Sequence, residues 1–326
     1  MKIAIVGATG EVGRMMLECL HDFDITPNEV ELFASAKSAG TTLYFADRPV
    51  VVQELSERTF DKFYDYVFFA AGGGIALAYA PLARKNSTLV IDNSSAFRED
   101  KDAILVIPQI NGDLLKDYSG IVANPNCSTI QMLLPLAVLD EAFTLKKVVV
   151  STYQSVSGSG REGVETLESQ RAGSKDKGIY PAIIDLNVVP HIGVFYDDGY
   201  SAEEHKMRNE TRRILRNDEI AVCATTVRVP VYYGHSNSVY CEFEKKVDLA
   251  LASKLLKSAE AIDLKEDSYM TPLKLGFSNL AHVSRLRQAV DDYSLCFWNV
   301  GHNVRIGAAA NAVSILKRHL ELQGEK

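Results

Sequence analysis

The sequence predicts two domains, a doubly wound α/β domain followed by an α+β domain built on a mixed sheet. A chain of 326 residues exceeds the size at which a single hydrophobic core usually keeps growing. Up to residue 126 short β-rich runs alternate with helical patterns, as a parallel sheet requires. From residue 127 the strands become longer and alternate apolar with polar residues, which favours a mixed or antiparallel sheet.

In the first domain, β-rich runs predict strands at 2–6, 30–34, 66–70, 88–91, 104–107 and 121–123. Residues 11–23 carry apolar side chains at helical spacing. This pattern is typical of a Rossmann-like nucleotide-binding domain, which we expect to cover 1–126.

The second domain, expected over 127–302, contains predicted strands at 147–156, 219–233, 238–246 and 292–300. The polar stretch 157–178 is a candidate loop or surface helix. The last segment, about 303–326, includes an alanine-rich helix expected over 307–322. We expect this helix to pack back onto the first domain.

Composition excludes several classes of function. A formal charge of −7 argues against a nucleic-acid surface or an anionic membrane as the main partner. No apolar run approaches the roughly 20 residues of a membrane-spanning helix. The chain starts without a secretory leader pattern, and its five cysteines show no paired framework, so we expect a reducing cytoplasm. Its seven histidines show no metal-ligand spacing, so no metal is expected.

A glycine-rich loop, Gly7-Ala-Thr-Gly10-Glu-Val-Gly13, follows the first predicted strand and opens a predicted helix. In that context glycines let the backbone approach a pyrophosphate at a helix N-terminus. We therefore expect the loop to bind a dinucleotide through a set of neighbouring residues, namely Gly7, Thr9, Gly10, Glu11 and Val12. The spacing GxxGxxG is less specific than GxGxxG, and a plain strand-to-helix turn is the alternative.

The end of the second predicted strand indicates which dinucleotide binds. NAD sites usually place Asp or Glu here to bind the ribose 2′-hydroxyl. This chain instead has Ser35, Lys37 and Ser38, two hydroxyls and an ammonium that suit a 2′-phosphate. The expected cofactor is therefore NADP, although a solvated surface lysine would give the same sequence.

Cys127 is the cysteine best placed to react. It follows Asn124-Pro-Asn and leads into an apolar helical run, so it is expected at a helix N-terminus, where a thiolate is favoured. Pro135 lies inside that run and predicts a kink or a different helix start. The alternative is that Cys127 is a small core residue.

A second cluster contains Arg228 and His235. Arg228 ends or lies within a predicted strand, and His235 follows Gly234 at a predicted turn, from which it could reach a cleft. Histidine suits proton transfer near neutral pH, so His235 is the candidate acid/base partner of Cys127.

Taken together in order, these motifs resemble the aspartate-semialdehyde dehydrogenases, relatives of the glyceraldehyde-3-phosphate dehydrogenase fold. The resemblance extends over essentially the whole chain. The matching segments are the glycine loop, Asn93-Ser-Ser-Ala-Phe-Arg98, Asn124-Pro-Asn-Cys127-Ser-Thr, Tyr153-Gln-Ser-Val-Ser-Gly158, Glu203-Glu-His-Lys206-Met, Arg228-Val-Pro-Val and Gly234-His-Ser.

The resemblance implies a role for each matching residue. Cys127 is the nucleophile, His235 its general acid/base, and Gln154 the residue that orients the covalent adduct. Binding of substrate and its phosphate is implied for Arg228, Glu203, Arg98, Lys206 and Asn126. Binding of the cofactor is further implied for Ser157, Gly158 and Asn311. A departure from the family pattern is His302, which stands where an aspartate is expected.

The expected reaction is the reductive dephosphorylation of L-aspartyl 4-phosphate to L-aspartate 4-semialdehyde through a thioester on Cys127. It belongs to the biosynthesis of lysine, threonine, methionine and diaminopimelate. A homodimer or a dimer of dimers is expected. The alternatives are an N-acetyl-glutamyl-phosphate reductase, whose substrate amine carries no charge, and a non-catalytic dinucleotide-binding protein.

Overall fold

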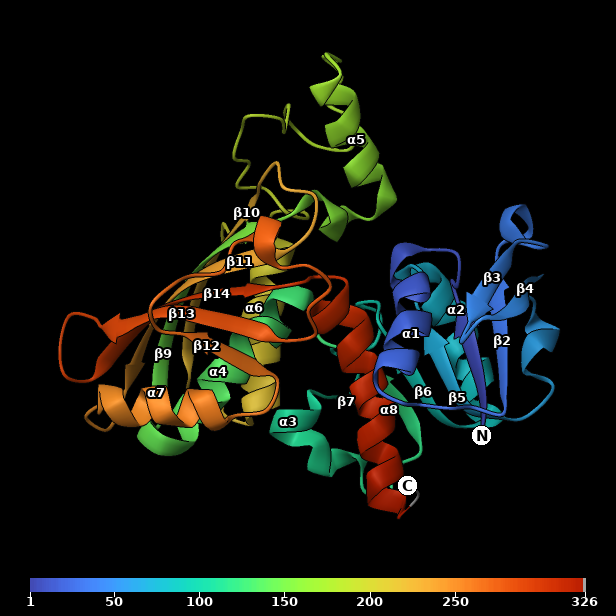
Figure 1. Ribbon diagram of the computed structural model, residues 1–326, viewed down its shortest axis with the longest axis horizontal. Coiled ribbons are helices and arrows are strands. Elements are labelled where there is room, and N and C mark those ends of the chain that lie inside the picture. Colours follow the sequence, from blue (N-terminus) through green and yellow to red (C-terminus); the bar gives the residue numbers. More distant parts are fainter. Residues whose placement is uncertain (325–326) are drawn as a thin grey trace. The chain divides into compact units, whose positions relative to one another are not determined.

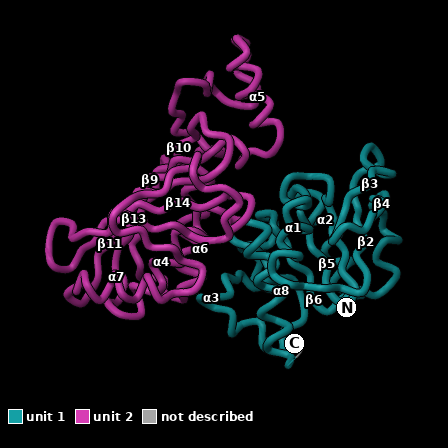
Figure 2. Tube along the Cα trace, viewed as in Figure 1, with its two compact units in different colours: residues 1–125, 308–326 teal, residues 126–307 magenta. Residues whose placement is uncertain are grey.

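The computed structural model describes residues 1–324, and the chain divides into two compact units. Unit 1 contains residues 1–125 and 308–326, and unit 2 contains residues 126–307 (Figure 2). The sequence analysis put the end of the first domain at residue 126, whereas unit 1 breaks off after residue 125. It put the start of the C-terminal segment that returns to this domain at about 303, whereas unit 1 resumes at residue 308.

Unit 1 contains a sheet with the strand order β3-β4-β2-β1-β5-β6-β8-β7. All neighbours pair in parallel except β3 and β4, which form an antiparallel hairpin at one edge. The strands are β1 (Lys2–Val6), β2 (Glu29–Ala34), β3 (Thr42–Phe45), β4 (Arg48–Glu54), β5 (Tyr64–Phe69), β6 (Ser87–Asp92), β7 (Ile104–Leu105) and β8 (Gly120–Ala123). The doubly wound fold predicted from the sequence is confirmed.

Helices α1 (Glu11–Asp22) and α8 (Ala310–Gln323) pack side by side against the sheet (Figure 1). Their apolar faces share one core with strand residues such as Ile3, Ile5 and Phe68. Helix α2 (Gly73–Lys85) packs on β5 and β6, and α3 (Pro108–Asn111) is a short helix that contacts α8. The C-terminal helix therefore completes the core of unit 1.

The β3–β4 hairpin was not expected from the sequence. Its two turn residues, Ala46 and Asp47, both have positive φ, as a two-residue hairpin turn requires. The usual Asn-Gly signal is absent, and β4 is mostly exposed, so no alternating pattern marks the strand.

Unit 2 contains a mixed sheet with the strand order β10-β9-β11-β14-β13-β12. The β10–β9 and β12–β13 pairs are parallel and the others are antiparallel. The strands are β9 (Leu145–Gln154), β10 (Ala221–Arg228), β11 (His235–Phe243), β12 (Ile262–Lys265), β13 (Ala281–Gln288) and β14 (Ser294–Gly301). The predicted mixed sheet is confirmed, but β12 and β13 were missed.

One face of this sheet is covered by helices α4 (Cys127–Phe143), α6 (Ala202–Leu215) and α7 (Leu249–Ser258) (Figure 1). Helix α4 continues through Pro135 and does not end there, and it is buried along most of its length. The stretch 157–178 contains α5 (Arg161–Arg171), the surface helix that was one of its two expected forms. A π-helical turn, Arg305–Ala309, leads into α8.

Candidate active site

The ends of three neighbouring strands bring Gln154, Arg228 and His235 to one edge of the unit 2 sheet. Gln154 ends β9 and is the register partner of Arg228, the last residue of β10. His235 starts β11, where the next residue, Ser236, pairs with Tyr153. The three residues are far apart in sequence, and it is the register of the sheet that brings their side chains to one edge.

His235 does not lie in a turn, as the sequence suggested. It is the first residue of β11 and is fully buried, and Gly234 before it, with φ of +91°, carries the turn. Its backbone carbonyl accepts a hydrogen bond from Gln131 Nε2 at 3.1 Å. Gln131 lies one helical turn after Cys127 on α4, so this bond fastens His235 to the start of that helix.

Cys127 is the first residue of α4, as predicted, and its side chain is half-buried. Asn126 is the N-cap, and its Oδ1 accepts hydrogen bonds from the backbone N–H groups of Ser128 at 2.9 Å and Thr129 at 3.2 Å. The cap fixes the first turn of the helix, and with it the position of Cys127. The positive end of the helix favours negative charge on a sulfur at this position.

Helix α6 holds Asn126 through two buried carboxylates. A capping box between Ser201 and Glu204 starts this helix. Glu203 Oε1 accepts a hydrogen bond from Asn126 Nδ2 at 2.7 Å, and Glu210 Oε2 accepts one from the Asn126 backbone N–H at 2.6 Å. Glu203 and Glu210 are seven residues apart and therefore lie on one face of α6. The sequence gave no indication of a role for Glu210.

Glu203 also links Gln154 to Lys206. Its Oε1 accepts a hydrogen bond from Gln154 Nε2 at 3.2 Å, and its Oε2 pairs with Lys206 Nζ at 3.2 Å. Burial raises the pKa of Glu203, but the charge of Lys206 and the hydrogen bond from Asn126 outweigh it, so its pKa is lowered. Glu203 is therefore an anion at neutral pH.

Arg228 is a buried cation, only 5% exposed. Its Nη1 donates to the Ser155 carbonyl at 2.7 Å, whereas its buried Nε has no hydrogen-bond partner among residues 1–324. Burial lowers the pKa of Arg228, but an arginine stays protonated at neutral pH. A buried donor left without a partner in the protein is typical of a group that binds a ligand.

The His235 ring is neutral at physiological pH. Burial, and then the positive charge of Arg228, lower the pKa of His235 to about 3. Its Nδ1 lies 3.0 Å from both the backbone nitrogen and the hydroxyl of Ser155. Its Nε2 is buried and has no hydrogen-bond partner in the described part of the chain.

Two glycines leave room at this site. A Cβ at Gly158 would lie 2.7 Å from Arg228 Nη1 and 3.1 Å from His235 Nε2. A Cβ at Gly307 would lie 2.7 Å from Cys127 Cβ. Gly158 is exposed. A ligand could therefore contact Arg228 Nη1 and His235 Nε2 through the space that a larger side chain at position 158 would fill.

A buried network that the sequence did not suggest supports His235. Asn303 Oδ1 accepts hydrogen bonds from the Gly234 N–H at 2.9 Å, from Ser155 Oγ at 3.2 Å and from Ser157 Oγ at 3.3 Å. Ser157, expected near the cofactor, is only 6% exposed and belongs to this network. Nothing in the sequence around Asn303 predicts these contacts.

The glycine loop of unit 1 lies where strand order reverses, because β1 pairs with β2 on one side and β5 on the other. Gly7 has φ of +82°, and a Cβ there would lie 2.7 Å from the Ala70 carbonyl oxygen. A Cβ at Gly13 would lie 2.3 Å from the Gly7 oxygen. Gly10 is the exposed N-cap of α1. Thr9, Glu11 and Val12 are half-buried beside it.

The end of β2 carries no carboxylate. Ser35 is the N-cap of a short 3-10 turn, Ala36–Ser38, that follows this strand. Ser35 and Lys37 are exposed, and Ser38 is half-buried. The predicted hydroxyls and ammonium therefore gather at the carboxyl end of β2, as the sequence indicated.

Arg98 and Asn311 also lie in unit 1. Arg98 is half-buried, and its guanidinium donates to the carbonyls of Asn124 at 2.9 Å and Asn93 at 3.1 Å. Asn311 is only 2% exposed, and its Nδ2 donates to Asn124 Oδ1 at 2.6 Å and to the Val106 carbonyl at 3.1 Å. These bonds fasten α8 to the end of the sheet.

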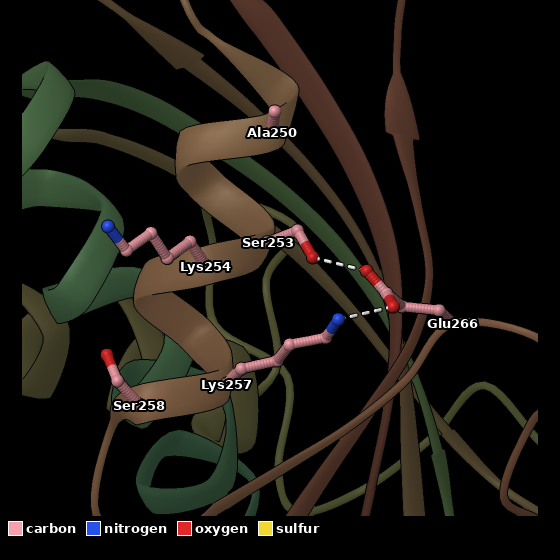
Figure 3. A pocket seen from close by; sticks show the side chains of 6 residues that line it. All are labelled: Ala250, Ser253, Lys254, Lys257, Ser258 and Glu266. Atoms are coloured by element: carbon pink, nitrogen blue, oxygen red, sulfur yellow. Dashed lines mark hydrogen bonds and ion pairs between the residues drawn. The ribbon is translucent and has the colours of Figure 1, made fainter.

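A surface hollow of about 450 Å³ lies in unit 2 between α7 and the end of β12 (Figure 3). Its lining includes Ser253 and Lys257, whose side chains both bind Glu266, as the dashed lines in Figure 3 show. The charged groups of this hollow are thus largely paired with one another. It contains none of the predicted site residues.

No helix among residues 1–324 is both long and apolar enough to span a membrane. No group of three or more His, Cys, Asp or Glu side chains in the same range is arranged to hold a metal ion.

Comparison with known proteins identifies the family. A family model described as semialdehyde dehydrogenase, NAD binding domain, matches residues 2–118, and one described as semialdehyde dehydrogenase, dimerisation domain, matches residues 133–306. The aspartate-semialdehyde dehydrogenase of Campylobacter jejuni is 42% identical, over 99% of this chain and 98% of the relative. That of Aquifex aeolicus is 41% identical, over 96% of each.

A solved structure agrees with these relatives. The Vibrio cholerae aspartate semialdehyde dehydrogenase II complexed with ASA has a TM-score of 0.93 and 36% identity, and the match covers 98% of both chains. The resemblance found in the sequence motifs is confirmed over both units: the chain belongs to the aspartate-semialdehyde dehydrogenase family.

Proposed function

We propose that this enzyme catalyses the NADP-dependent reductive dephosphorylation of L-aspartyl 4-phosphate to L-aspartate 4-semialdehyde through a thioester on Cys127. One observation carries the proposal. The Arg228 guanidinium and His235 Nε2 lie where Gly158 leaves space, and Arg228 Nε and His235 Nε2 are buried without hydrogen-bond partners among residues 1–324. The anion Glu203 contacts Asn126, the residue before Cys127.

The charges suit an amino-acid substrate. The guanidinium of Arg228 binds a carboxylate well, since a planar pair of donors matches its two oxygens. The carboxylate of Glu203 complements an α-ammonium group. An N-acetylated substrate has no such charge and would leave Glu203 without its counterpart, so these two residues favour aspartate over the acylated alternative.

The acyl chemistry belongs to Cys127, Gln154 and His235. The Cys127 thiolate attacks the acyl carbon, and phosphate leaves from the resulting adduct. The side chain of Gln154 orients the adduct. His235 acts on the reacting oxygen. NADPH, when bound, supplies the hydride that reduces the thioester. Asn126 keeps the nucleophile in place through the cap already described.

Two cations are proposed to bind the phosphate of the substrate. Lys206 is 35% exposed at its side chain while it pairs with Glu203, so it can contact both the protein and a ligand. Arg98 has a guanidinium that two carbonyls orient. Its role follows from the family resemblance.

The cofactor is proposed to bind unit 1. Gly7, Gly10 and Gly13 open the start of α1 to a pyrophosphate, and the seryl and lysyl groups at the end of β2 suit a 2′-phosphate. Thr9, Glu11 and Val12 line the loop. Ser157, Gly158 and Asn311 are proposed to complete the cofactor contacts, on the family resemblance. The product feeds lysine, threonine, methionine and diaminopimelate synthesis in the cytoplasm.

The face of the unit 2 sheet opposite α4 is proposed to bind a second copy of the chain. Val149, Tyr240 and Cys296 are cross-strand partners in one row, so they share a face. Tyr153 and Trp298 lie with ring centres 5.6 Å apart on the same sheet. Val149 and Tyr153 are 40% and 38% exposed. An apolar sheet face of this kind is typical of a subunit interface.

Light scattering on the purified protein tests this interface. We expect a dimer that Val149→Asp combined with Tyr153→Asp converts to a folded monomer. Leu273, which is 97% exposed, provides the control, and Leu273→Asp is expected to leave the dimer intact. A monomeric wild-type protein would refute the proposal.

The reaction is tested by following NADP⁺ reduction with L-aspartate semialdehyde, with and without phosphate. We expect turnover that needs phosphate and disappears in Cys127→Ala, while that variant still binds NADPH. N-acetyl-glutamate semialdehyde serves as the competing substrate. Turnover of that compound alone, or dehydrogenase activity retained in Cys127→Ala, would overturn the proposal.

A further inference from the structure

Asn124 is a buried residue of unit 1, only 1% exposed, and each of its hydrogen-bonding groups has a partner. Its backbone N–H donates to the Asp92 carbonyl at 2.7 Å, and its own carbonyl accepts from Arg98 Nε at 2.9 Å. In the side chain, Oδ1 accepts from Asn311 Nδ2 at 2.6 Å, and Nδ2 donates to Asn93 Oδ1 at 2.8 Å. The amide is therefore held at both of its ends.

Two backbone carbonyls determine which way this amide points. The Ala308 carbonyl lies 3.2 Å from Asn124 Nδ2, and the Val106 carbonyl lies 3.1 Å from Asn311 Nδ2. A carbonyl oxygen can accept but never donate, so the atom that faces each carbonyl must be an amide nitrogen. Asn311 therefore presents a donor to Asn124, which must answer with Oδ1. The nitrogen of Asn124 is left to donate to Asn93.

Asn93 and Asn124 together hold the guanidinium of Arg98. Arg98 Nη2 donates to the Asn93 carbonyl at 3.1 Å, beside the bond from Nε to the Asn124 carbonyl. The two acceptors follow different strands, because Asn93 comes directly after β6 and Asn124 directly after its parallel neighbour β8. The side-chain bond between the two asparagines joins these strand ends, so it sets the spacing of the two carbonyls.

We infer that Asn124 is a positioning residue for phosphate binding, because its side chain fixes the two carbonyls that orient Arg98. This inference rests on the proposed function, in which Arg98 binds the phosphate of the substrate. A guanidinium binds phosphate through a planar set of donors, so the orientation of its plane decides how well they meet the oxygens. Without the Asn124 side chain that plane is less firmly held, and phosphate binds more weakly.

The first test compares Asn124 with a second buried asparagine of unit 1. Asn111 is also 1% exposed, and its side chain accepts from the Ile107 N–H at 2.9 Å and donates to the Leu105 carbonyl at 2.8 Å. Asn111→Ala therefore removes buried amide bonds of the same kind, none of which is made to the residues that hold Arg98. This variant controls for a general loss of stability in unit 1.

Phosphate is varied at saturating NADP⁺ and L-aspartate semialdehyde. We expect Asn124→Ala to raise KM for phosphate about tenfold, as the weakening of one charge-assisted hydrogen bond would do, while kcat changes less than about threefold. Asn111→Ala should leave this KM unchanged. An unchanged KM for phosphate in Asn124→Ala, or an equal rise in Asn111→Ala, would overturn the inference.

A double-mutant cycle tests whether Asn124 acts through Arg98. Arg98→Ala should itself raise KM for phosphate, and adding Asn124→Ala to it should change that KM less than about twofold further. Asn93→Ala removes the acceptor of the same side-chain bond but keeps the backbone carbonyl, so it replaces Asn124→Ala in the cycle if the latter does not fold. Full additivity would show that the asparagine acts independently of Arg98 and would overturn the inference.

Calorimetric titration with inorganic phosphate separates this inference from the proposed function, because it needs no turnover. Weaker phosphate binding in Asn124→Ala than in the wild-type protein supports the inference even if aspartate semialdehyde is not the substrate. Phosphate-dependent turnover of the wild-type enzyme, combined with undiminished phosphate binding in Asn124→Ala, would overturn the inference alone. A wild-type protein that neither binds phosphate nor needs it would refute the proposed function and this inference together.

Discussion

The carboxylate of Glu210 accepts a hydrogen bond from the backbone N–H of Asn126 at 2.6 Å, although 84 residues separate them in sequence. Glu210 is only 3% exposed, and the peptide it holds lies directly before Cys127, the proposed nucleophile. The turn that presents the thiol is thus fixed from α6 as well as from its own helix cap.

We expect Glu210→Ala to lower kcat by about 10²-fold, because small displacements of a reacting group cost rate steeply. Stability should fall by about 1–3 kcal/mol as the Asn126 N–H loses its acceptor. Glu210→Gln keeps an acceptor oxygen and should recover most of the rate. Steady-state kinetics and denaturant unfolding measure both effects. Equal rates in the two variants would contradict a positioning role.

A side chain at position 158 should block the substrate. The added Cβ of Gly158→Ala would lie 2.7 Å from Arg228 Nη1, inside the space that we assign to the substrate carboxylate. We expect KM for aspartate semialdehyde to rise at least tenfold, about 1.4 kcal/mol, with thermal stability unchanged. Gly158→Val should be worse than Gly158→Ala. An unchanged KM in both variants would place the substrate elsewhere.

Reversing the charge at Lys37 should change cofactor preference. Lys37 is exposed at the end of β2, where a 2′-phosphate would bind. We expect Lys37→Glu to weaken NADP binding about tenfold while NAD binding is unchanged or improves, because a carboxylate binds a 2′-hydroxyl and repels a phosphate. Fluorescence titration with NADPH and NADH measures the ratio. Equal weakening of both cofactors would contradict a phosphate contact.

Buried neutral histidines should make stability fall in mild acid. Burial lowers the pKa of His235 to about 3 and that of His302 to about 4, from an ordinary value of 6.5. Between about pH 6.5 and 4 the unfolded chain therefore binds two protons that the folded chain does not. Stability is full above pH 6.5 and falls with decreasing pH by about 2.7 kcal/mol per unit near pH 5. Burial also lowers the pKa of His282, so this histidine too makes the folded protein less stable as the pH falls.

Chemical denaturation between pH 7 and 4.5 measures this slope. The His302 ring contacts the rings of Tyr233 and Phe277, at centroid distances of 5.7 and 6.0 Å. We expect His302→Gln to remove about 1.4 kcal/mol per pH unit from the slope near pH 5. An unaltered slope would show that His302 is not buried as a neutral ring.

The sequence predicted those parts of the site that short sequence patterns determine, namely the start of a helix and the glycine loop. Asn126 is a favourable N-cap, so the helix start at Cys127 could be inferred directly, and the glycine loop follows its strand as expected. The burial of His235 could not be inferred, because it depends on which strands pair beside β11. Ser155 and Asn303 contact each other across 148 positions, and no local pattern encodes such a contact.

The two missed strands of unit 2 have a similar explanation. β13 has a mostly polar sequence and an irregular register between Ser284 and Arg287, with Arg285 at a positive φ of 54°. Its pairing with β14 and β12 comes from tertiary structure, which overrides weak strand propensity.

The close approach of Gly307 to Cys127 brings two distant parts of the chain together within unit 2. The chain passes from one unit to the other at two places, between Pro125 and Asn126 and between Gly307 and Ala308. Cys127 lies one residue beyond the first crossing and contacts the last residue before the second. Both crossings therefore lie next to Cys127, the proposed nucleophile, and any side chain added at Gly307 would press on it.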